Sequence, residues 1–399
     1  MKVVFINDQG MRRYRLVVVT ALTCLVALVA ACSSDSSSDP DAAVRPVVAR
    51  YAVVAKASYD DVVAKARQMK TAIDTFADAP SQATLDAAKA AWLAARTPYG
   101  HTEAFRFYGG PIDDEKEGPE GRVNGWPLDE AFIDYVTGDA KAGIVNHAAE
   151  FPTITKELLV DQNEKGGESN IATGWHAIEF LLWGQDLDEN GPGARPFTDY
   201  VIGATGVQQT AQRRRAYLKV VTQLLVDDLE GVARAWDTST PDSFGSRFVA
   251  AAPAEGLTKA FRGMIMLASV ELVRERMNNA YTKGDQEEEH SCFSDNTPAD
   301  LLANAVAIEN VYLGRGPSED GIGIDELVRA KDAAVDARVK ERFAAALAAV
   351  REIPAPFDRA VLREPGRSKV KAAIDACNAL TGALLEAAKV MGVTVNIQE

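Results

Sequence analysis

A histidine and a glutamate three residues apart are the sharpest chemical feature of this sequence. His176 and Glu179 occur in the segment GWHAIE at residues 174–179, and Asn170 or Thr173 could cap a helix that contains this segment. Residues three apart lie on one face of a helix, and imidazole and carboxylate are good ligands for a borderline divalent metal. The competing interpretation is a structural hydrogen bond inside a helical core, which the spacing alone favours.

The surroundings of this pair exclude the best-known helical metal motifs. A zincin needs a second histidine one residue after the glutamate, and Phe180 occupies that position. Di-iron bundles place the glutamate before the histidine, which is the reverse of the order here. A histidine-rich site is also excluded, because the chain has only four histidines, His101, His147, His176 and His290.

An acidic and a basic residue that precede this segment are further candidates for the ligand site. Glu103 could complete a ligand set from a neighbouring helix, and Tyr99 gives it an aromatic context. Arg106 could keep this carboxylate ionised or bind an anionic substrate through two hydrogen bonds. The alternative is a charged pair on a solvated helix face, which contributes little to stability. For Asp113, in the loop that follows, capping of the loop is the expected role.

The second half of the chain carries a partial copy of this arrangement. Glu271 and Arg276 flank an apolar helical segment, where an ionised acid needs a partner, so a structural ion pair is the favoured interpretation. Glu309 follows an Ala-Ile pair as the glutamate of GWHAIE does, but Val306 stands where the histidine would be. This pattern is expected if a single site lies where the two halves meet.

The N-terminus has the three parts of a secretory signal. A cationic patch of arginines is followed by a mostly apolar stretch, which is shorter than the ~20 residues that a spanning helix needs. The stretch ends in VAAC, which resembles a lipobox. Residues 1–31 are therefore expected to be a signal peptide, and Cys32 the lipidated first residue of the mature protein.

The mature protein is therefore expected outside the cytoplasm, anchored to a membrane by the lipid on Cys32. Residues 32–46, in which a run of serine and aspartate follows Cys32, indicate a flexible tether. Ser33 resembles the signal for transfer to the outer membrane in a host with two membranes, so the protein is expected in the periplasm or on the cell surface. The net charge of −14 excludes nucleic acid as an expected partner.

Two cysteines remain for the mature domain. Cys292 and Cys377 form an even pair in an oxidising compartment, and a disulfide between them is expected. His290 and Glu289 lie beside Cys292 and could form a second ligand set. The favoured interpretation is that Cys292 is half of the disulfide and that His290 stabilises a loop.

The spacing of apolar residues predicts an all-α protein. Long stretches repeat apolar residues every three or four positions, and no alternating strand pattern occurs. Ser81 is a suitable N-cap for one helix, and residues 113–126, rich in charge and glycine, predict a loop. The predicted helices span residues 47–76, 82–108, 128–136, 143–159, 170 or 173 to 182, 207–236, 256–283, 299–313, 324–350 and 368–390.

A faint internal repeat suggests how these helices are grouped. A shift of the chain by about 130 residues places the AIE of residues 177–179 on the AIE of residues 307–309, and it also aligns the glycines of the loops that follow. We therefore expect two helical bundles related by duplication, at residues 47–205 and 206–399. Duplications of this kind commonly place a site where the halves meet.

Several longer strings resemble the imelysin family. Two strings near the second bundle, RERM at 274–277 and EHSCFSDNT at 289–297, resemble its iron-regulated protein A branch. The matches extend from about Tyr51 to the C-terminus. The strings of the first bundle are GWHAIE at 174–179, WLAAR at 92–96, PY at 98–99, EAFRF at 103–107, GPID at 110–113, NGWPLDE at 124–130 and IDY at 133–135.

This resemblance implies two helical bundles in an exported lipoprotein with a link to iron acquisition. His176 and Glu179 carry over directly as candidate ligands, with Glu103 on a neighbouring helix. The family is often classed with peptidases after a reported insulin-cleaving activity, although its fold is unlike that of known metallopeptidases. Pro298 stands where this branch is expected to have a histidine after Asp-Asn-Thr, and weaker metal binding follows if that histidine serves a metal.

Three functions follow as hypotheses. The first is capture of iron, haem or another iron-related ligand between the lobes, together with iron-uptake components. The second is a metallopeptidase with His176 as ligand and Glu179 as ligand or general base. It ranks lower because a hydrolase normally needs three protein ligands and an open metal position. The third is a structural or partner-docking surface lipoprotein without a small ligand.

Overall fold

The computed structural model describes residues 41–203 and 205–397, and this part of the chain is all-α. It contains no β-strand within the described residues, where two isolated β-bridges are the only extended pairing. The expected signal peptide and Cys32 lie outside the described residues. The first helix begins at Val44, so the end of the predicted tether belongs to a helix.

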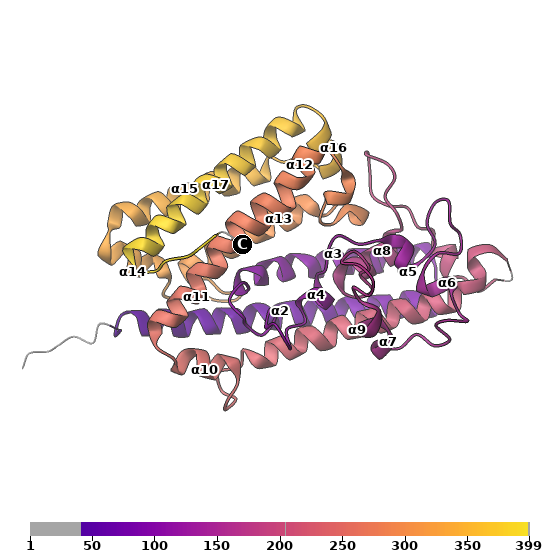
Figure 1. Ribbon diagram of the computed structural model, residues 1–399, viewed down its shortest axis with the longest axis horizontal. Helices are drawn as coiled ribbons and strands as arrows, with labels where there is room; N and C mark the ends of the chain where they lie inside the picture. Colours follow the sequence, from indigo (N-terminus) through magenta and orange to yellow (C-terminus); the bar gives the residue numbers. More distant parts are fainter. Residues whose placement is uncertain (1–40, 204, 398–399) are drawn as a thin grey trace, which may run out of the picture. The chain divides into compact units, whose positions relative to one another are not determined.

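Long helices make up most of the described chain (Figure 1). They are α2 (Val44–Asp78), α3 (Gln82–Thr102), α9 (Ala211–Ala235), α11 (Pro253–Met266), α13 (Thr297–Leu313), α15 (Ala333–Arg351) and α17 (Gly366–Val390). Shorter helices and turns connect them: η1 (Glu103–Phe105), α4 (Glu120–Val123), α5 (Glu130–Ile133), α6 (Gly143–Asn146), α7 (Lys156–Gln162), α8 (Gly174–Trp183), η2 (Phe197–Tyr200), η3 (Gly206–Thr210), α10 (Phe244–Ala250), η4 (Leu267–Asn278), α12 (Asn279–Lys283), η5 (Gln286–Glu288), η6 (Cys292–Ser294), α14 (Ile324–Lys331) and α16 (Phe357–Leu362).

Local sequence signals explain where several helices begin and end. Ser81 caps α3, since its Oγ accepts a hydrogen bond from the backbone N–H of Thr84 at 3.2 Å. The helix predicted at 324–350 is instead two helices, α14 and α15. Asp332 separates them, because its Oδ1 accepts hydrogen bonds from the N–H groups of Ala334 and Val335 and so caps α15. The predicted helix 143–159 is likewise divided into α6 and α7.

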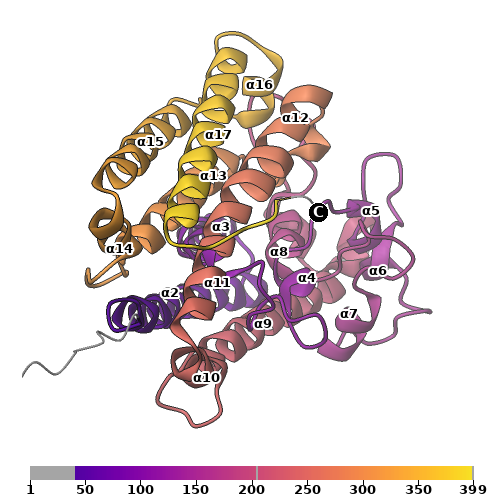
Figure 2. The same cartoon turned by 60° about the vertical axis from the view of Figure 1, so that its left-hand side comes forward.

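Two groups of long helices pack together in the described chain (Figures 1 and 2). Helix α2 packs along both α3 and α9, and α17 packs along α15 and η4. Helix α13 connects the groups, because it packs on α3 as well as on α15 and η4. The closest approach is at Gly100, where a Cβ atom would lie 2.6 Å from the Cβ of Ala303. Only the absence of a side chain lets α3 and α13 come so close.

The contacts divide the helices differently from the boundary predicted at residue 205. Residues 43–399 form one compact unit. Helix α9, which the sequence assigns to the second bundle, packs along α2 and also contacts α4, α6, α7 and α8. Its buried face is therefore part of the first group of helices. The duplication stays a prediction, although α8 and α13 both end at a glycine with positive φ, Gly184 and Gly314.

One segment has an unusual helical geometry. The helix predicted at 256–283 is continuous, but its middle part, η4, is a π-helix of 12 residues. Glu271 and Arg276 lie on this π-helix. Most π-helical segments are a single turn and frequently occur at functional sites, so this segment is relevant to the site described below.

The predicted disulfide is not formed. Cys292 and Cys377 are both buried, and no bond joins them. Cys377 is on the face of α17 that packs in the second group of helices, whereas Cys292 begins the η6 turn, which packs against α8. The two thiols thus belong to different parts of the core. Among the described residues, no helix has both the length and the apolar composition needed to cross a membrane.

Candidate ligand site

The glycine of the GWHAIE segment fixes the start of α8. Gly174 has a φ of +82°, and a Cβ atom there would lie 2.4 Å from the carbonyl oxygen of Val123. A side chain would clash with α4 and strain the backbone. Thr173 is the N-cap residue, but its Oγ1 donates to the carbonyl oxygen of Arg122 at 2.8 Å and does not cap the helix. Both contacts hold the start of α8 against α4.

His176 and Glu179 form a buried hydrogen-bonded pair on α8. Both side chains are fully buried, and the His176 Nδ1 lies 2.8 Å from the Glu179 Oε2. The other carboxyl oxygen of Glu179 accepts hydrogen bonds from the backbone N–H of Ser294 at 2.9 Å and from its hydroxyl at 2.6 Å. Ser294, in η6, thus connects α8 to the second half of the chain.

Burial keeps this pair uncharged near neutral pH. It raises the pKa of Glu179 to about 8, although the hydrogen bonds from Ser294 oppose the shift. Burial also lowers the pKa of His176, and the nearby His290 and Arg96 add to this effect. Below about pH 8 the proton therefore resides on Glu179, which donates it to Nδ1 of the neutral imidazole. The His176 Nε2 atom is buried and has no hydrogen-bond partner within the described residues.

The second half of the chain places another histidine against His176. The rings of His176 and His290 meet edge to face with their centroids 4.7 Å apart, and Trp126 lies 4.9 Å from the His176 ring. Histidine, histidine and indole thus form a contiguous aromatic group. The His176–Glu179 pair is sealed from solvent, but His176 contacts His290 and Trp126, which line a cavity.

A buried network fixes the orientation of His290. Its Nδ1 lies 3.2 Å from the Asp300 Oδ2, which also accepts hydrogen bonds from Arg96 and Ser291. Asn124 accepts from Arg96 through its Oδ1 at 2.6 Å, so its amide nitrogen faces the His290 Nε2 at 3.4 Å. The Arg96 Nη2 also lies 3.2 Å from this Nδ1, so the tautomer is assigned from the Asn124 amide. That amide donates to Nε2, which places the ring proton on Nδ1, facing Asp300.

The environment keeps His290 neutral as well. Burial lowers the pKa of His290, and the cations Arg276 and Arg96 lower it further. Asp300 thus accepts the Nδ1 proton of His290, as carboxylates commonly do for imidazoles that bind metals, whereas at His176 the protonated Glu179 is the donor. The same arrangement also occurs in purely structural networks.

The buried side chain of Arg96 supports the group formed by His176, His290 and Trp126. The side chain is 2% exposed, and besides Asp300 and Asn124 its guanidinium lies over the rings of Tyr99 at 5.2 Å and Trp175 at 5.8 Å. Hydrogen bonds and aromatic faces together compensate for the burial of its charge. Tyr99, a predicted supporting residue, therefore packs against the Arg96 guanidinium.

Glu103 is held by two arginines and does not contact the His176–Glu179 pair. Arg106 donates to its carboxylate at 3.1 Å, and Arg276 donates to it as well. Burial alone would raise the pKa of Glu103, but Arg106 and Arg276 lower it to about 2. Glu103 therefore stays ionised and binds both arginines. It would serve as a ligand only if Arg106 and Arg276 moved away.

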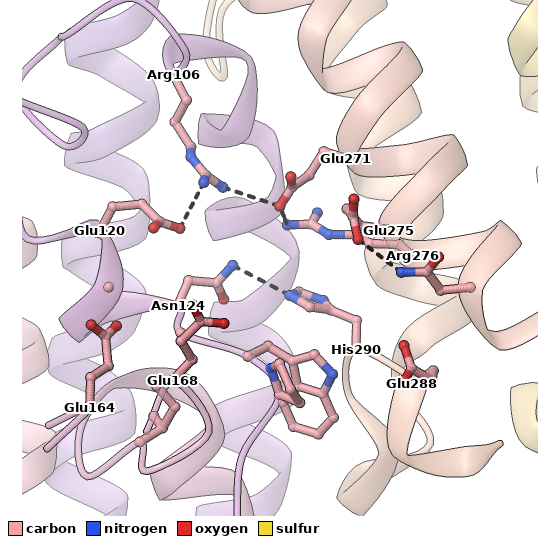
Figure 3. Close-up of a pocket in the computed structure, with 16 residues that line it drawn as sticks. Arg106, Glu120, Asn124, Glu164, Glu168, Glu271, Glu275, Arg276, Glu288 and His290 are labelled. Carbon is pink, nitrogen blue, oxygen red and sulfur yellow. Dashed lines mark hydrogen bonds and ion pairs between the residues drawn. The ribbon is translucent and has the colours of Figure 1, made fainter. Parts of the chain in front are cut away.

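The two arginines extend this network to a cavity. Arg106 pairs with Glu120 at 2.8 Å and with Glu271 at 3.6 Å, and Arg276 pairs with Glu271 at 3.1 Å. The predicted ion pair of Glu271 and Arg276 is therefore present. Figure 3 shows Arg106 lying between Glu120 from the first half and Glu271 from the π-helix.

The cavity has a volume of about 520 Å³, and six of its sixteen lining residues are glutamates. His290 and Trp126 are part of its wall, whereas His176, Glu179 and Glu103 lie behind it. The two halves supply opposite sides (Figure 3). We refer to it as the glutamate-lined cavity, after its six acidic residues Glu120, Glu164, Glu168, Glu271, Glu275 and Glu288.

Other predicted site residues lie elsewhere. Asp113 accepts hydrogen bonds from the N–H groups of Phe107, Tyr108 and Gly110, which is the loop-capping role expected for it. Glu309 pairs with Arg315 at 3.2 Å and lines a separate hollow. In the part of the chain that the structure describes, no group of three or more His, Cys, Asp or Glu side chains is arranged to hold a metal ion.

The sequence did not single out several residues that build the site. Arg96, Asn124, Trp126 and Ser294 lie in the strings that carry the family resemblance, which was the available signal. Their roles depend on partners far along the chain, such as Asp300, which is 204 residues from Arg96. Such pairings cannot be deduced from local spacing.

Comparison with known proteins places this fold and site in a family. The sequence model of the family described as Imelysin matches residues 55–384. The chain belongs to the imelysin family. An imelysin relative, the iron-regulated protein A of Synechococcus elongatus, is 25% identical over 339 residues, which cover 82% of this chain and 80% of the relative.

Two solved structures share the imelysin fold. A protein described as an iron-regulated protein A precursor, from Parabacteroides distasonis, aligns with a TM-score of 0.69 and 19% identity over 87% of this chain and 94% of its own. An imelysin-like protein from Psychrobacter arcticum aligns with a TM-score of 0.61 and 13% identity over 88% of this chain and 98% of its own. At these identities, the likeness concerns the fold alone.

Proposed function

We propose that this protein captures a positively charged, iron-related ligand in the glutamate-lined cavity. The observation that carries the proposal is the charge of the cavity wall, where six glutamates face two arginines. Both arginines already pair with acids of the network. Glu275 and Glu288 pair with Arg274 and Lys283 in turn. Glu164 and Glu168 form no ion pair among the described residues, and their charge gives the cavity a negative potential that attracts cations.

The size and ligand types of the cavity favour a hydrated or chelated cation. About 520 Å³ is within the usual range for a small-molecule site and far larger than a bare metal ion needs. Carboxylates suit hard cations, and the imidazole of His290 adds a borderline ligand at the wall. Outer contacts through bound water or a chelator are consistent with the absence, among the described residues, of a preformed group of three ligands.

His176 and Glu179 act in this proposal by positioning His290. His176 supports the ring of His290 from behind, and Glu179 ties η6 to α8 through Ser294. The His176 Nε2 has no partner among the described residues, but it carries the ring proton while Glu179 donates to Nδ1. Direct metal binding there would therefore require Glu179 to be deprotonated and the His290 ring to move aside. A metal there would supply Lewis acidity, while His176 and His290 would be the residues that hold it.

The sequence supports a proposal for the setting of this function. We infer that the protein is exported, anchored through a lipid on Cys32 and located in the periplasm or on the cell surface, where the outer membrane is the favoured site. There it would deliver its ligand to components of iron uptake. Two relatives are named as iron-regulated proteins, which supports a role linked to iron.

Binding measurements on charge variants test the cavity. Calorimetric titration of the purified protein with anaerobic ferrous iron, and separately with anionic ferric citrate, should show binding of the cation and rejection of the anionic chelate. The double variant Glu275→Gln/Glu288→Gln should bind about tenfold more weakly or worse, because each lost charged contact is worth roughly 1.5–3 kcal/mol. The matched control is Asp114→Asn/Glu117→Gln, in a separate hollow. Equal affinities in all three proteins would remove the cavity as the site.

The His176–Glu179 pair needs its own test. The metal content of the wild type should be compared with that of His176→Ala and Glu179→Ala. Equal content together with lower melting temperatures would favour the structural, partner-docking alternative. The metallopeptidase alternative requires a peptidase activity that both substitutions abolish, and an activity that survives them belongs to a contaminant.

A further inference from the structure

A second group of acids lies outside the glutamate-lined cavity, where three segments of the chain meet. The loop after α8 bonds to η6 through the Gly193 N–H and the Phe293 carbonyl oxygen at 3.0 Å. The same loop contacts α16, because Glu189 pairs with Arg363 and Asn190 accepts from Arg359 at 3.3 Å. The loop, the segment around η5 and η6, and α16 therefore form one junction.

Each of these segments contributes a carboxylate to this junction. Asp186 comes from the loop, Glu289 and Asp295 flank η6, and Asp358 comes from α16. We refer to these four residues as the acidic cluster. Asp186 is 7% exposed, Glu289 1% and Asp358 2%, so three of the four carboxylates are more than nine-tenths buried.

The acidic cluster has few of the partners that buried carboxylates normally have. One oxygen of Asp186 accepts from the backbone N–H of Asp188 at 3.0 Å, and one of Asp358 accepts from that of Arg359 at 2.6 Å. Oxygen atoms of all four residues, including both of Glu289, have no hydrogen-bond partner among the described residues. Thr297 and Gln286 lie near Glu289 and Asp186, but neither makes a hydrogen bond of normal geometry with them. No lysine or arginine of the described chain forms an ion pair with the cluster. A buried carboxylate in this position must take up a proton or attract a cation.

The members of the cluster act on one another. Burial raises the pKa of Glu289, and repulsion by Asp358, Asp295 and Asp186 raises it further. Burial likewise raises the pKa of Asp295 to about 7, with Asp186 and Asp358 as the next causes. The four carboxylates thus lie within electrostatic range of one another.

The sequence of the loop independently suggests which ligand it accepts. Residues 186–191 read DLDENG, which matches the first half of the D-x-D-x-N-G calcium loop of EF-hands. The full loop would end with a bidentate glutamate at position twelve, where this chain has Phe197. Glu289, Asp295 and Asp358 could supply the carboxylate oxygens that the loop itself lacks.

We propose that the acidic cluster, together with the loop at residues 186–191, is a second cation site that takes a hard divalent ion of the calcium type. As they stand, no three of its carboxylates already surround one point, so the ion would draw Asp186, Glu289 and Asp358 together by side-chain rotation. Calcium tolerates such adaptation, because it accepts six to eight oxygen ligands in flexible geometry.

Such an ion would also stabilise the candidate ligand site. Glu289 directly precedes His290, and Asp295 directly follows Ser294, which holds Glu179. A cation between the loop, η6 and α16 would therefore fix the segment that presents His290 to the glutamate-lined cavity. The cation site does not depend on what the cavity binds.

Calcium titration of the whole purified chain tests this site. After treatment with EDTA, calcium chloride is added while heat release and melting temperature are recorded. At a free calcium concentration 100 times the Kd, the melting temperature should rise by about 4 °C for a unit of this size. Asp186→Asn and Asp358→Asn should each weaken calcium binding by about tenfold or more and remove most of that rise.

Two control variants separate this site from others. Asp320→Asn changes an exposed acid in another glycine-rich loop and should keep the full calcium response. Glu275→Gln/Glu288→Gln should also keep it, even if this variant no longer binds iron, so the two proposals fail independently. A wild type without any calcium response, or an equal response in Asp186→Asn and Asp358→Asn, would overturn the proposal. Higher stability of both variants together with no calcium response would show that the carboxylates are protonated instead.

Discussion

At the scale of single residues, the site combines sealed and accessible groups. His176 and Glu179 are fully buried and joined by one hydrogen bond, and the His176 Nε2 has no partner among the described residues. Their surroundings are not apolar, however, because His290 lies against His176 and reaches the glutamate-lined cavity. The motif therefore reaches the cavity only through a neighbour that the local sequence pattern does not reveal.

Replacement of Glu179 by glutamine should change how stability depends on pH. The folded protein keeps the Glu179 proton up to about pH 8, while the unfolded chain releases it near pH 4.5. The contribution of this group to stability is therefore complete below pH 4.5 and is lost as the pH rises through 8. Glutamine mimics the protonated acid and does not titrate. Urea unfolding between pH 5.5 and 8.5 should show the wild type losing on the order of 1 kcal/mol per pH unit relative to Glu179→Gln. Parallel stability curves would contradict the assignment of the proton.

Replacement of the buried Arg96 by alanine should be among the most destabilising single substitutions in the described chain. Arg96→Ala leaves Asp300 buried without its cation and opens space beneath Tyr99. Breaking a buried ion pair from one side costs about 3–5 kcal/mol, measurable by urea unfolding. Arg67→Ala is the control, since Arg67 pairs with Glu230 on the surface and should cost no more than about 1 kcal/mol. Similar losses in both variants would show that the Arg96 network contributes little.

At the scale of elements, the helices followed largely from the sequence, and the exceptions have physical causes. The apolar spacing predicted α2, α9, α13 and α17 to within a few residues. It could not predict the π-helical geometry of η4, which depends on packing rather than on periodicity. It also merged α14 with α15, because Asp332 interrupts a helical pattern that continues on both sides.

The start of α8 offers a sharp test at this scale. Gly174→Ala should destabilise the protein, because the new Cβ would clash with the Val123 carbonyl oxygen at a φ that alanine avoids. Gly382→Ala is a matched control, since it lies in the exposed face of α17 with no atom near its Cβ position. That change should stabilise the protein by up to about 1 kcal/mol. Thermal unfolding distinguishes the two signs, and a neutral Gly174→Ala would refute the close approach of α4 and α8.

At the scale of the whole molecule, contacts between distant segments determine what the sequence could not. The all-α fold and the family were predicted correctly, because apolar spacing and the longer strings extend over most of the chain. The boundary at residue 205 was placed between elements that pack together, since nothing in the sequence of α9 indicates that its partner is α2. The cavity was likewise unpredictable, because its wall combines residues from opposite halves.

This packing predicts cooperative unfolding. Because α9 packs on α2 and α13 joins α3 to the second group of helices, neither group can unfold without exposing the other. Calorimetry of residues 43–399 should therefore show a single transition, with equal calorimetric and van't Hoff enthalpies. Two separated transitions at any pH between 6 and 8 would show that the halves are independent domains.

The burial of Cys377 gives this molecule an internal reporter of its own opening. The thiol is fully buried in α17, and burial raises its pKa to about 12. A thiol that is neither deprotonated nor accessible cannot react with an alkylating reagent. The rate of its alkylation, followed by mass spectrometry, would therefore measure how often α17 leaves the core, without an engineered label.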